Sequence, residues 1–504
     1  MKLYFTGHDY RYGVEQLMMT LFPGQRPQYP AGGPDGSGPA AQVVLEERAG
    51  EAVAHARLWW QGEEYRGEAR FPLPAGEPEG IRTRQRAVGM ALYQAAVAAL
   101  GEEPPWGALT GVRPVKLPTR RLWMGGSREE ALSELVDDFR VSPDRAELAM
   151  DCAHAALTVR AALPANSLSL YLGIPFCPTR CSYCSFIAAD VKRTLQLVEP
   201  YVDALCREIA HTGRLMREHG LVVSTAYMGG GTPTTLTASQ LGRVLEAVYT
   251  HIPMEGCGEF TVEAGRPDTI TADKLAVLRD YGIHRISINP QTMDNGILQT
   301  LGRGHTAEDI ERAMELAHRH FGGLVNMDLI AGLPGDSPAG FARTLERVLV
   351  MAPANVTVHT LARKKGATLR EQPQTLCTPQ QVARMLAMAE DTLRDRGWQP
   401  YYLYRQKYMS GSFENVGWCQ EGTACRYNII MMEELQSVLS LGAAGITKLV
   451  HPATGKIERL SHPKFPKEYL ESWDKIAGDK LRAVEFQHSL VSCQRKGNGS
   501  WPIN

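Results

Sequence analysis

The chain has 504 residues, of which 44% are apolar and 22% are charged, values typical of globular proteins and unlike those of disordered or fibrous chains. Lys and Arg number 54 against 55 Asp and Glu, so the cationic excess of a non-specific nucleic-acid binder is missing. The best apolar run, 88–100, is too short to span a bilayer, and the N-terminus lacks the apolar core of a secretory signal. We therefore expect a cytoplasmic globular protein of roughly three domains.

The first predicted region, residues 1–163, is expected to be an α+β extension of unassigned role. A glycine-rich loop at 32–41 precedes two strand-like runs, at 43–48 and 52–60, and helical patterns follow at 82–100 and 128–163. No motif in this region indicates a particular chemistry.

The second region, residues 164–377, alternates short β-rich runs with helical patterns. Strands are predicted at 168–172, 224–229, 259–264, 284–290, 324–330 and 355–361, and helices at 193–218, 239–250, 272–281, 306–320 and 340–351. This alternation predicts an α/β fold with a parallel sheet and helices outside it. Because every notable motif follows a strand, we predict a partial (β/α)6 barrel with its site at the carboxyl ends of the strands.

The third region, residues 378–504, is expected to be a mostly helical C-terminal domain that covers the substrate side of the barrel. A helix is predicted at 378–397, followed by the aromatic-rich segment 401–409 and a further helix. The final stretch, from about residue 488, is polar and unpatterned, and we expect it to be frayed.

Three of the ten cysteines, Cys177, Cys181 and Cys184, fall within eight residues, in the loop after the first barrel strand. Random placement gives this spacing only about 0.004 times in such a chain, so the cluster calls for a chemical explanation. A long chain with few cysteines is unlike a secreted disulfide scaffold. Pro175 and Pro178 keep the loop from forming a helix.

The number of thiols distinguishes between two kinds of metal site. A structural zinc site is closed by four ligands, and three cysteines leave it incomplete. A [4Fe–4S] cluster held by three cysteines keeps one iron free for an outside ligand, which makes that iron a reaction site. We therefore predict that Cys177, Cys181 and Cys184 are the metal ligands. The alternative is a zinc site that borrows a distant ligand such as Cys206.

The spacing of the three cysteines resembles that of the radical S-adenosylmethionine (radical SAM) superfamily. The resemblance implies a [4Fe–4S] cluster and SAM as cofactors: the free iron binds the amino and carboxylate groups of SAM, and an electron from the cluster cleaves the sulfonium to a 5′-deoxyadenosyl radical. The segment GGGTPT after the second strand resembles the family's glycine-rich segment, in which Gly229, Gly230, Gly231 and Thr232 would approach the methionine end of SAM. It lacks the Gly-Lys-Ser/Thr ending of a phosphate-binding loop.

Residues from about 166 to 450 more closely resemble the oxygen-independent coproporphyrinogen III oxidases (coproporphyrinogen dehydrogenases), and the extension and the segments 358–369 and 401–417 resemble the HemZ-type branch. The matching motifs are IPFC, TVEAGRP, INPQTMD, LGRGH and NMDLIAGLPG. The resemblance implies that SAM is contacted by Tyr171, Glu263, Gln291, Arg303, Asp328 and the backbone of Ala362. Each of these polar residues, taken alone, could simply form a hydrogen bond at the end of the sheet. Their occurrence together, in the order of the family motifs, favours the SAM site.

The resemblance also implies a reaction. A hydrogen is removed from the β-carbon of a propionate, CO2 and one electron then leave, and a vinyl group remains. Two propionates of coproporphyrinogen III react in this way to give protoporphyrinogen IX in porphyrin and haem biosynthesis, with a reductant such as flavodoxin or ferredoxin. Two groups of cations are candidates for binding the substrate carboxylates: Arg363, Lys364 and Lys365, and Arg405 with Lys407 among several tyrosines. A solvated charge run beside ordinary aromatic packing is the alternative.

The chain departs from the family pattern at two positions, where Gly173 replaces a His and Phe186 a fourth Cys. Neither is a predicted cluster ligand, so the departures concern substrate handling. Cys419 and Cys425 are too few for a second cluster, and we expect free thiols there.

Two other functions have less support in the sequence. Related haem chaperones carry HNxxYW after a Cys-Arg pair, whereas this chain reads CRYNIIMME with Tyr427 in place of the His, so the His of that motif, its expected haem ligand, is missing. A haem-binding protein without decarboxylase activity is the alternative function. Radical modification of RNA usually comes with a basic domain, and the net charge of −1 offers no support for it.

Overall fold

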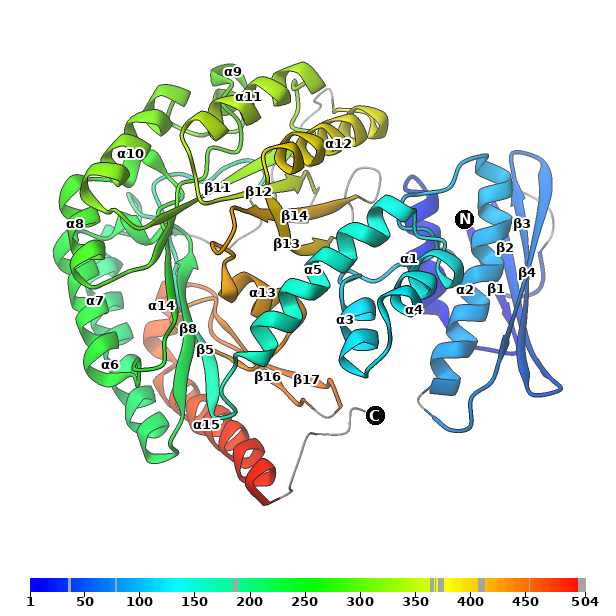
Figure 1. Cartoon of the computed structure of the whole chain (residues 1–504), viewed down its shortest axis with the longest axis horizontal. Helices are drawn as coiled ribbons and strands as arrows, with labels where there is room; N and C mark the ends of the chain where they lie inside the picture. Colours follow the sequence, from blue (N-terminus) through cyan, green and yellow to red (C-terminus); the bar gives the residue numbers. More distant parts are fainter. Residues whose placement is uncertain are drawn as a thin grey trace. The chain divides into compact units, whose positions relative to one another are not determined.

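The structure is a computed structural model that describes residues 1–34, 38–77, 79–184, 189–362, 367, 369, 376–406, 413–452 and 454–496, with side chains up to Ser492 (Figure 1). The chain divides into two compact units. Unit 1 comprises residues 1–150 and 405–413, and unit 2 comprises residues 151–404 and 414–504.

Unit 1 is a four-stranded sheet with two helices packed on it. The strands lie in the order β1 (Lys2–Thr6), β2 (Ala40–Arg48), β3 (Glu51–Trp60) and β4 (Glu63–Pro72), with β1 parallel to β2 and the others antiparallel. Helices α1 (Arg11–Leu21) and α2 (Glu79–Leu100) share a hydrophobic core with the sheet. Because a Cβ on Gly67 would lie 2.1 Å from the carbonyl oxygen of Ala91, the glycine lets α2 approach β4 closely. The predicted strands at 43–48 and 52–60 are confirmed.

The helical stretch predicted at 128–163 is interrupted. After α3 (Lys116–Trp123), the chain forms α4 (Arg128–Ser133), a π-helical turn (Glu134–Asp138) and then α5 (Pro143–Ala161). Arg140 has a left-handed backbone with φ of 58°, which ends the first helical segment, and Pro143 begins the next.

Unit 2 contains the predicted barrel strands. The parallel strands are β5 (Ser167–Ile174), β8 (Val222–Gly230), β9 (Glu259–Glu263), β10 (Arg285–Ser287), β11 (Leu324–Ala331) and β12 (Asn355–Thr360), adjacent in that order. They alternate with α6 (Leu195–Glu218), α7 (Ala238–His251), α8 (Ala272–Asp280), α9 (Asn295–Thr300), α10 (Ala307–His320) and α11 (Pro338–Val350). The helices lie outside the strands (Figure 1), so the predicted α/β fold is confirmed.

The C-terminal third also contributes strands to this sheet, although a mostly helical domain was expected. β14 (Glu414–Cys419) pairs antiparallel with β12, and β13 (Gln399–Arg405) lies beyond it. At the other edge, β15 (Val438–Leu441) pairs parallel with β5, followed by β16 (Ile446–Val450) and β17 (Ile457–Ser461). The helices of this region are α12 (Pro379–Asp395), α13 (Arg426–Glu433), α14 (Pro466–Glu471) and α15 (Trp473–Lys496). Among the described strands, β13 and β17 are the two edges of an open sheet.

Helix α15 continues to Lys496, so the expectation of fraying from about residue 488 is wrong for the last turns of this helix. Leu490 and Val491 are buried, and the ring of His488 bonds to the carbonyl oxygen of His219 at the end of α6 (Nδ1–O 3.1 Å). These contacts stabilise the helix where the sequence alone shows no clear pattern.

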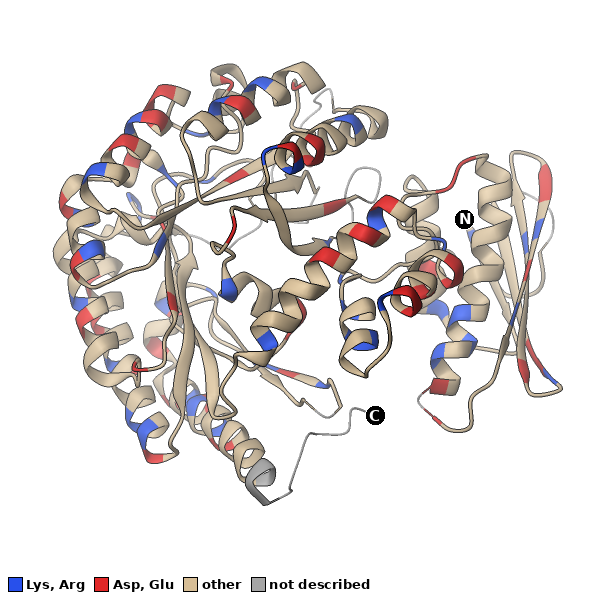
Figure 2. Cartoon of the chain, viewed as in Figure 1, with Lys and Arg blue, Asp and Glu red and all other residues tan. Residues whose placement is uncertain are grey.

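Charged side chains of both signs are interspersed along the outer helices of unit 2 (Figure 2), in keeping with the balanced composition. Within the described residues, no helix is both long and apolar enough to cross a membrane.

Candidate functional site

The cysteine loop leaves the carboxyl end of β5 and lies against the glycine-rich segment that follows β8. The amide of Gly231 donates to the carbonyl oxygen of Ile174, and the amide of Thr232 to that of Phe176, both at 2.7 Å. Phe176 and Cys177 then form the short strand β6 (Phe176–Cys177), which pairs with β7 (Ala189–Asp190). The two motifs therefore belong to one hydrogen-bonded structure.

The glycines in this segment are needed for that close approach. A Cβ on Gly231 would stand 2.5 Å from the carbonyl oxygen of Phe176, which is too close for any side chain. Gly230 has φ of 106°, a conformation that favours glycine. Gly230 and Gly231 therefore allow this segment to pack against the strand that carries Cys177.

Two polar groups contact the cysteine sulfurs directly. The hydroxyl of Thr232 lies 3.4 Å from Sγ of Cys177, and Nη1 of Arg266 donates to Sγ of Cys181 at 3.7 Å. Cys177, Cys181 and Cys184 are all free thiols and partly exposed.

This donor set fits a cluster better than a single ion. Within the described part of the chain, no three His, Cys, Asp or Glu side chains converge as ligands of one metal ion must. In a [4Fe–4S] cluster each cysteine binds a different iron, so the sulfurs need not converge. Hydrogen bonds to the ligand sulfurs are also typical of such clusters.

A group of polar side chains lies on the inner face of the sheet, next to the cysteine loop. On β9, Phe260 packs toward the ring of Tyr249 on α7, so Glu263, an odd number of residues further on, faces inward. The hydroxyl of Tyr227 on β8 donates to Oε1 of Glu263 at 2.7 Å, and Tyr171 stacks on Tyr227 with ring centroids 6.4 Å apart.

The first glycines of the segment pack closely against these side chains. Oε1 of Glu263 lies 3.4 Å from the point where a Cβ on Gly229 would stand, and the hydroxyl of Tyr171 lies the same distance from that point on Gly230. A side chain at either position would press on Tyr171, Tyr227 or Glu263, so the glycines keep the surroundings of these polar groups clear.

The pKa of Glu263 is raised from its ordinary value of 4.5 to about 7: burial is the main cause and the charge of Asp328 adds to it, while the bond from Tyr227 and the nearby His359 oppose the shift. Asp328 on β11 lies 3.7 Å from His359 on β12, Oδ2 to Nε2. The carboxylates predicted to contact SAM therefore lie on the same inner face.

The backbone of Gln291 and the side chain of Arg303 are both hydrogen-bonded within the protein. The backbone amide of Gln291 donates to the carbonyl oxygen of Asp328 at 2.9 Å, and the backbone of Gln291 is left-handed, with φ of 67°. The guanidinium of Arg303 donates to the hydroxyl of Tyr183 and to the carbonyl oxygens of Gly265 and Asn289, each at 2.8 Å. Arg303 thus ties the cysteine loop to the ends of β9 and β10.

Most of the cationic residues predicted to bind the substrate are not described by the structure. Arg363, Lys364, Lys365 and Lys407 lie outside the described residues, as does Phe186, whereas Ala362 is described and lies two residues after the end of β12.

Arg405 belongs to unit 1 and makes its described contacts within that unit. Its amide donates to the carbonyl oxygen of Val112 at 2.8 Å, its guanidinium donates to that of Leu109, and the guanidinium lies over the ring of Trp106. These contacts favour a structural role over propionate binding.

Two of the neighbouring tyrosines are not exposed either, and Tyr408 lies outside the described residues. Tyr401 and Tyr402 are buried in unit 2, and the hydroxyl of Tyr402 bonds to that of Thr357 at 3.2 Å. Cys419 and Cys425 are buried free thiols, and Cys425 donates to Oε1 of Glu259 at 3.2 Å. Both cysteines therefore serve packing.

Unit 1 has a cavity of about 1030 Å³ that includes none of the predicted site residues. Four arginines and four acidic residues line it: Arg82, Arg86, Arg120, Arg121, Asp9, Glu79, Glu130 and Glu134. Because these charges balance, the lining favours neither an anionic nor a cationic ligand.

Known proteins share both the sequence and the fold. The profile of the radical SAM superfamily matches residues 171–348. The Bacillus subtilis oxygen-independent coproporphyrinogen-III oxidase-like protein HemZ is 36% identical over 417 residues, which make up 81% of this chain and 83% of that protein. The Escherichia coli heme chaperone HemW is 25% identical over 307 residues, 60% of this chain and 76% of that protein. The structure of E. coli coproporphyrinogen III oxidase (HemN), a radical SAM enzyme, has a TM-score of 0.50 at 25% identity and covers 64% of this chain and 73% of its own.

The open barrel and the matched profile define the class: this is a radical SAM protein, and the predicted cofactors, a [4Fe–4S] cluster and SAM, are those of its superfamily. Within the superfamily, the chain belongs to the HemZ-type branch of the oxygen-independent coproporphyrinogen III oxidase family. The resemblance found in the sequence is confirmed. Relatives include proteins named as oxidases and as haem chaperones, so the family alone does not select between these activities.

Two residues of the site escaped sequence analysis. Tyr227 stands two positions before Gly229 on the same strand, and this period-two spacing is the signal that it faces the same side. Arg266 stands in the recognised motif TVEAGRP, but nothing in the motif indicates that its side chain reaches back to Cys181.

Proposed function

We propose that this protein catalyses the oxygen-independent oxidative decarboxylation of two propionates of coproporphyrinogen III, giving protoporphyrinogen IX. In this proposal Cys177, Cys181 and Cys184 hold the cluster. The SAM site is lined by Tyr171, Gly229, Gly230, Gly231, Thr232, Glu263, Gln291, Arg303, Asp328 and Ala362. A reductant of the flavodoxin or ferredoxin class supplies the electron, and the substrate is a tetrapyrrole.

The observation that supports an enzyme rather than a haem chaperone is the environment of Tyr427. Tyr427 stands where the chaperone motif has its His, and it is 4% exposed with its ring 4.7 Å from that of Tyr227. Tyr227 in turn bonds Glu263. The residue is therefore part of the aromatic packing behind the carboxylate, which supports a role in shaping a SAM site rather than in binding haem.

The proposed reaction gives particular residues of the chain a role in binding and orienting SAM. When bound, the cluster and SAM supply the radical that abstracts the propionate hydrogen. Glu263, fixed by Tyr227, is positioned to accept hydrogen bonds from ribose hydroxyls. Asp328, beside His359, keeps a second acceptor on the same face. Holding the nucleoside in one orientation places the reacting carbon near its target.

The decisive experiment is anaerobic. After cluster reconstitution, the protein is incubated with SAM, a low-potential reductant and coproporphyrinogen III. We expect protoporphyrinogen IX with release of CO2 and 5′-deoxyadenosine. Formation of 5′-deoxyadenosine without CO2 would show radical chemistry on another substrate. Stoichiometric haem binding without turnover would favour the chaperone alternative.

The proposed role of Glu263 makes SAM binding depend on pH. Hydrogen bonds to a charged group contribute about 1.5–3 kcal/mol, so Glu263→Gln should weaken SAM binding about 10- to 100-fold. The pKa of Glu263 is about 7 in the folded protein, against 4.5 ordinarily. Below this pKa the carboxyl is protonated and is a poorer acceptor, so SAM affinity should rise as the pH increases through about 7 and then level off. Isothermal titration calorimetry between about pH 6 and about pH 8 measures this.

The raised pKa of Glu263 also affects the stability of the fold, which should decrease with pH where SAM affinity increases. Because folding raises the pKa of Glu263, its folded state holds the proton more tightly than the unfolded state. Its contribution to stability is therefore complete below the unfolded pKa and is lost as the pH rises through the folded pKa. Glu263→Gln is the control for both effects: a pH-dependent step in SAM affinity that persists in this variant would assign the titration to another group.

A further inference from the structure

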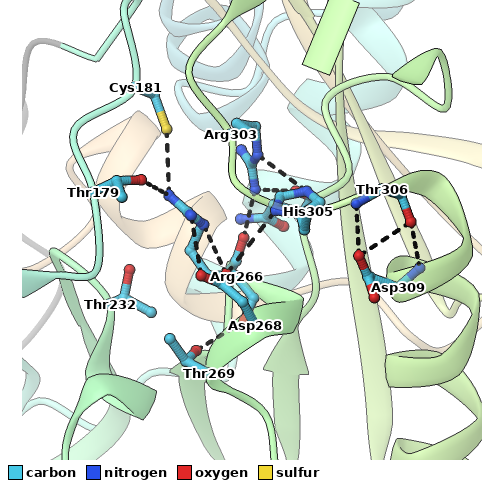
Figure 3. Close-up of polar contacts among 12 residues, drawn as sticks. Thr179, Cys181, Thr232, Arg266, Asp268, Thr269, Arg303, His305, Thr306 and Asp309 are labelled. Atoms are coloured by element: carbon cyan, nitrogen blue, oxygen red, sulfur yellow. Dashed lines mark hydrogen bonds and ion pairs between the residues drawn. The ribbon is translucent and has the colours of Figure 1, made fainter. Parts of the chain in front are cut away.

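A buried arginine, Arg266, connects the end of β9 to the cysteine loop. It is 4% exposed, and Nη1 donates both to Sγ of Cys181 at 3.7 Å and to Oγ1 of Thr179 at 3.0 Å (Figure 3). A guanidinium in this position puts a positive charge beside a proposed cluster ligand and fixes the loop on one side of it.

The orientation of this guanidinium is set by a carboxylate on its other edge. Nε of Arg266 donates to Oδ1 of Asp268 at 3.0 Å, and Nη2 donates to Oδ2 at 3.2 Å. Such two-point pairing restricts the planar group to one geometry, so Nη1 remains directed at the loop (Figure 3). The Asp268 side chain is 31% exposed, which leaves its negative charge partly solvated.

The groups around this pair add positive charge on the same side. Arg303, 5% exposed, bonds Tyr183 next to Cys184. His305 lies between Arg303 and Asp268, with Nε of Arg303 donating to its Nε2 at 3.3 Å. Burial and the two arginines lower the pKa of His305 to about 3, so it remains neutral and adds no charge of its own. Arg180 in the loop itself is exposed.

We infer that Arg266 is a positioning residue that holds Cys181 and raises the reduction potential of the proposed cluster, with Asp268 opposing it. The inference rests on the cluster site proposed above. Reduction adds one electron, taken from a donor of the ferredoxin or flavodoxin class, so the cluster and its thiolates become more negative by one charge. A fixed positive charge and an N–H directed at a ligand sulfur stabilise this reduced state.

The pair gives two tests of opposite sign. In Arg266→Gln the positive charge is removed, so the reduced-to-oxidised ratio at a fixed potential should fall about tenfold, which is about 59 mV for a one-electron couple. In Asp268→Asn the opposing charge is removed, so the ratio should rise. Arg266→Lys keeps the charge without the two-point geometry and should lie between wild type and Arg266→Gln. EPR-monitored redox titration of the reconstituted proteins measures each potential.

The control is Arg243→Gln, which removes an exposed arginine on α7 that pairs with Glu199 and Asp203 on α6. It should leave the potential unchanged. Iron and acid-labile sulfide are quantified in every sample, so a wild type without a cluster would refute the proposed site itself. If Arg266→Gln and Asp268→Asn keep full iron and the wild-type potential, the inference about Arg266 is overturned. If Arg266→Gln fails to retain iron, Asp268→Asn decides alone, and an unshifted potential overturns the inference.

Discussion

Replacement of Cys181 by serine is expected to abolish the [4Fe–4S] cluster and SAM cleavage with it. With three protein ligands and one open iron, the proposed cluster has no spare thiolate. The nearest alternative donors in the loop are hydroxyls, which bind iron–sulfur clusters poorly because iron in these clusters prefers thiolates. We expect iron and sulfide to fall to a small fraction of wild type and SAM cleavage to fall at least about 100-fold. Metal analysis and chromatographic assay of 5′-deoxyadenosine measure both.

The matched control is Cys206→Ser. Cys206 is a partly buried thiol on α6, and its only described partner is a weak contact, 3.8 Å to the carbonyl oxygen of Arg243. Serine should be tolerated there, and both iron content and SAM cleavage should be retained. The variant also tests the zinc alternative, since loss of a bound zinc ion in Cys206→Ser and Cys181→Ser alike would contradict the cluster.

The barrel strands were predictable because their hydrophobic pattern is strong, whereas β4 and β15 were not. β5 and β11 are apolar runs bounded by helical patterns, as expected of strands buried on both faces. β4 reads EEYRGEARFP, and only Ala69 is buried, so hydrophobicity does not reveal it. Its pairing with β3 and the fit of Gly67 under α2 stabilise it, and the second of these involves residues distant in sequence. β15 has four residues, too few for a period to be recognised.

The candidate site divides in the same way. The three cysteines and the glycine segment are local motifs, and their spacing could be read from the sequence. The bond from Tyr227 to Glu263 joins residues 36 positions apart, and that from Arg266 to Cys181 joins residues 85 apart. Which side chains meet across such separations depends on strand order and register. Arg405 illustrates the converse: its motif suggested a substrate contact, and the fold instead packs it on Trp106.

Replacement of Arg285 by alanine should destabilise unit 2 by about 3–5 kcal/mol, because it leaves a buried carboxylate without its partner. Arg285 is 2% exposed, and its guanidinium donates to the side-chain oxygens of Asn326 and Asn355, to the carbonyl oxygen of Thr423 at 2.7 Å, and to Oε2 of Glu259 at 3.5 Å. The expected loss is a large part of the stability of an ordinary domain, about 5–15 kcal/mol. Denaturant unfolding followed by tryptophan fluorescence measures it.

Two further variants separate this mechanism from a general effect of mutation. Arg279→Ala removes an exposed arginine of α8 that pairs with Asp280, and it should change the free energy of unfolding by about 0.5 kcal/mol or less. The double variant Arg285→Met with Glu259→Gln removes both charges and should recover part of the loss, since replacing a whole buried pair costs less than breaking it. A single Arg285→Ala variant that unfolds like wild type would contradict the role of the pair.

The Arg285–Glu259 pair should also affect the SAM site through helix α13. The carboxylate of Glu259 accepts hydrogen bonds from the amides of Arg426 and Tyr427, at 3.2 and 3.1 Å, and so caps the first turn of that helix. Once Arg285 is gone, the Glu259 side chain is free to shift, and the first turn of α13 loosens. Tyr427 then loses its fixed place against Tyr227, the residue that orients Glu263. We therefore expect Arg285→Ala to weaken SAM binding at temperatures where the protein is still folded, whereas Arg279→Ala should not.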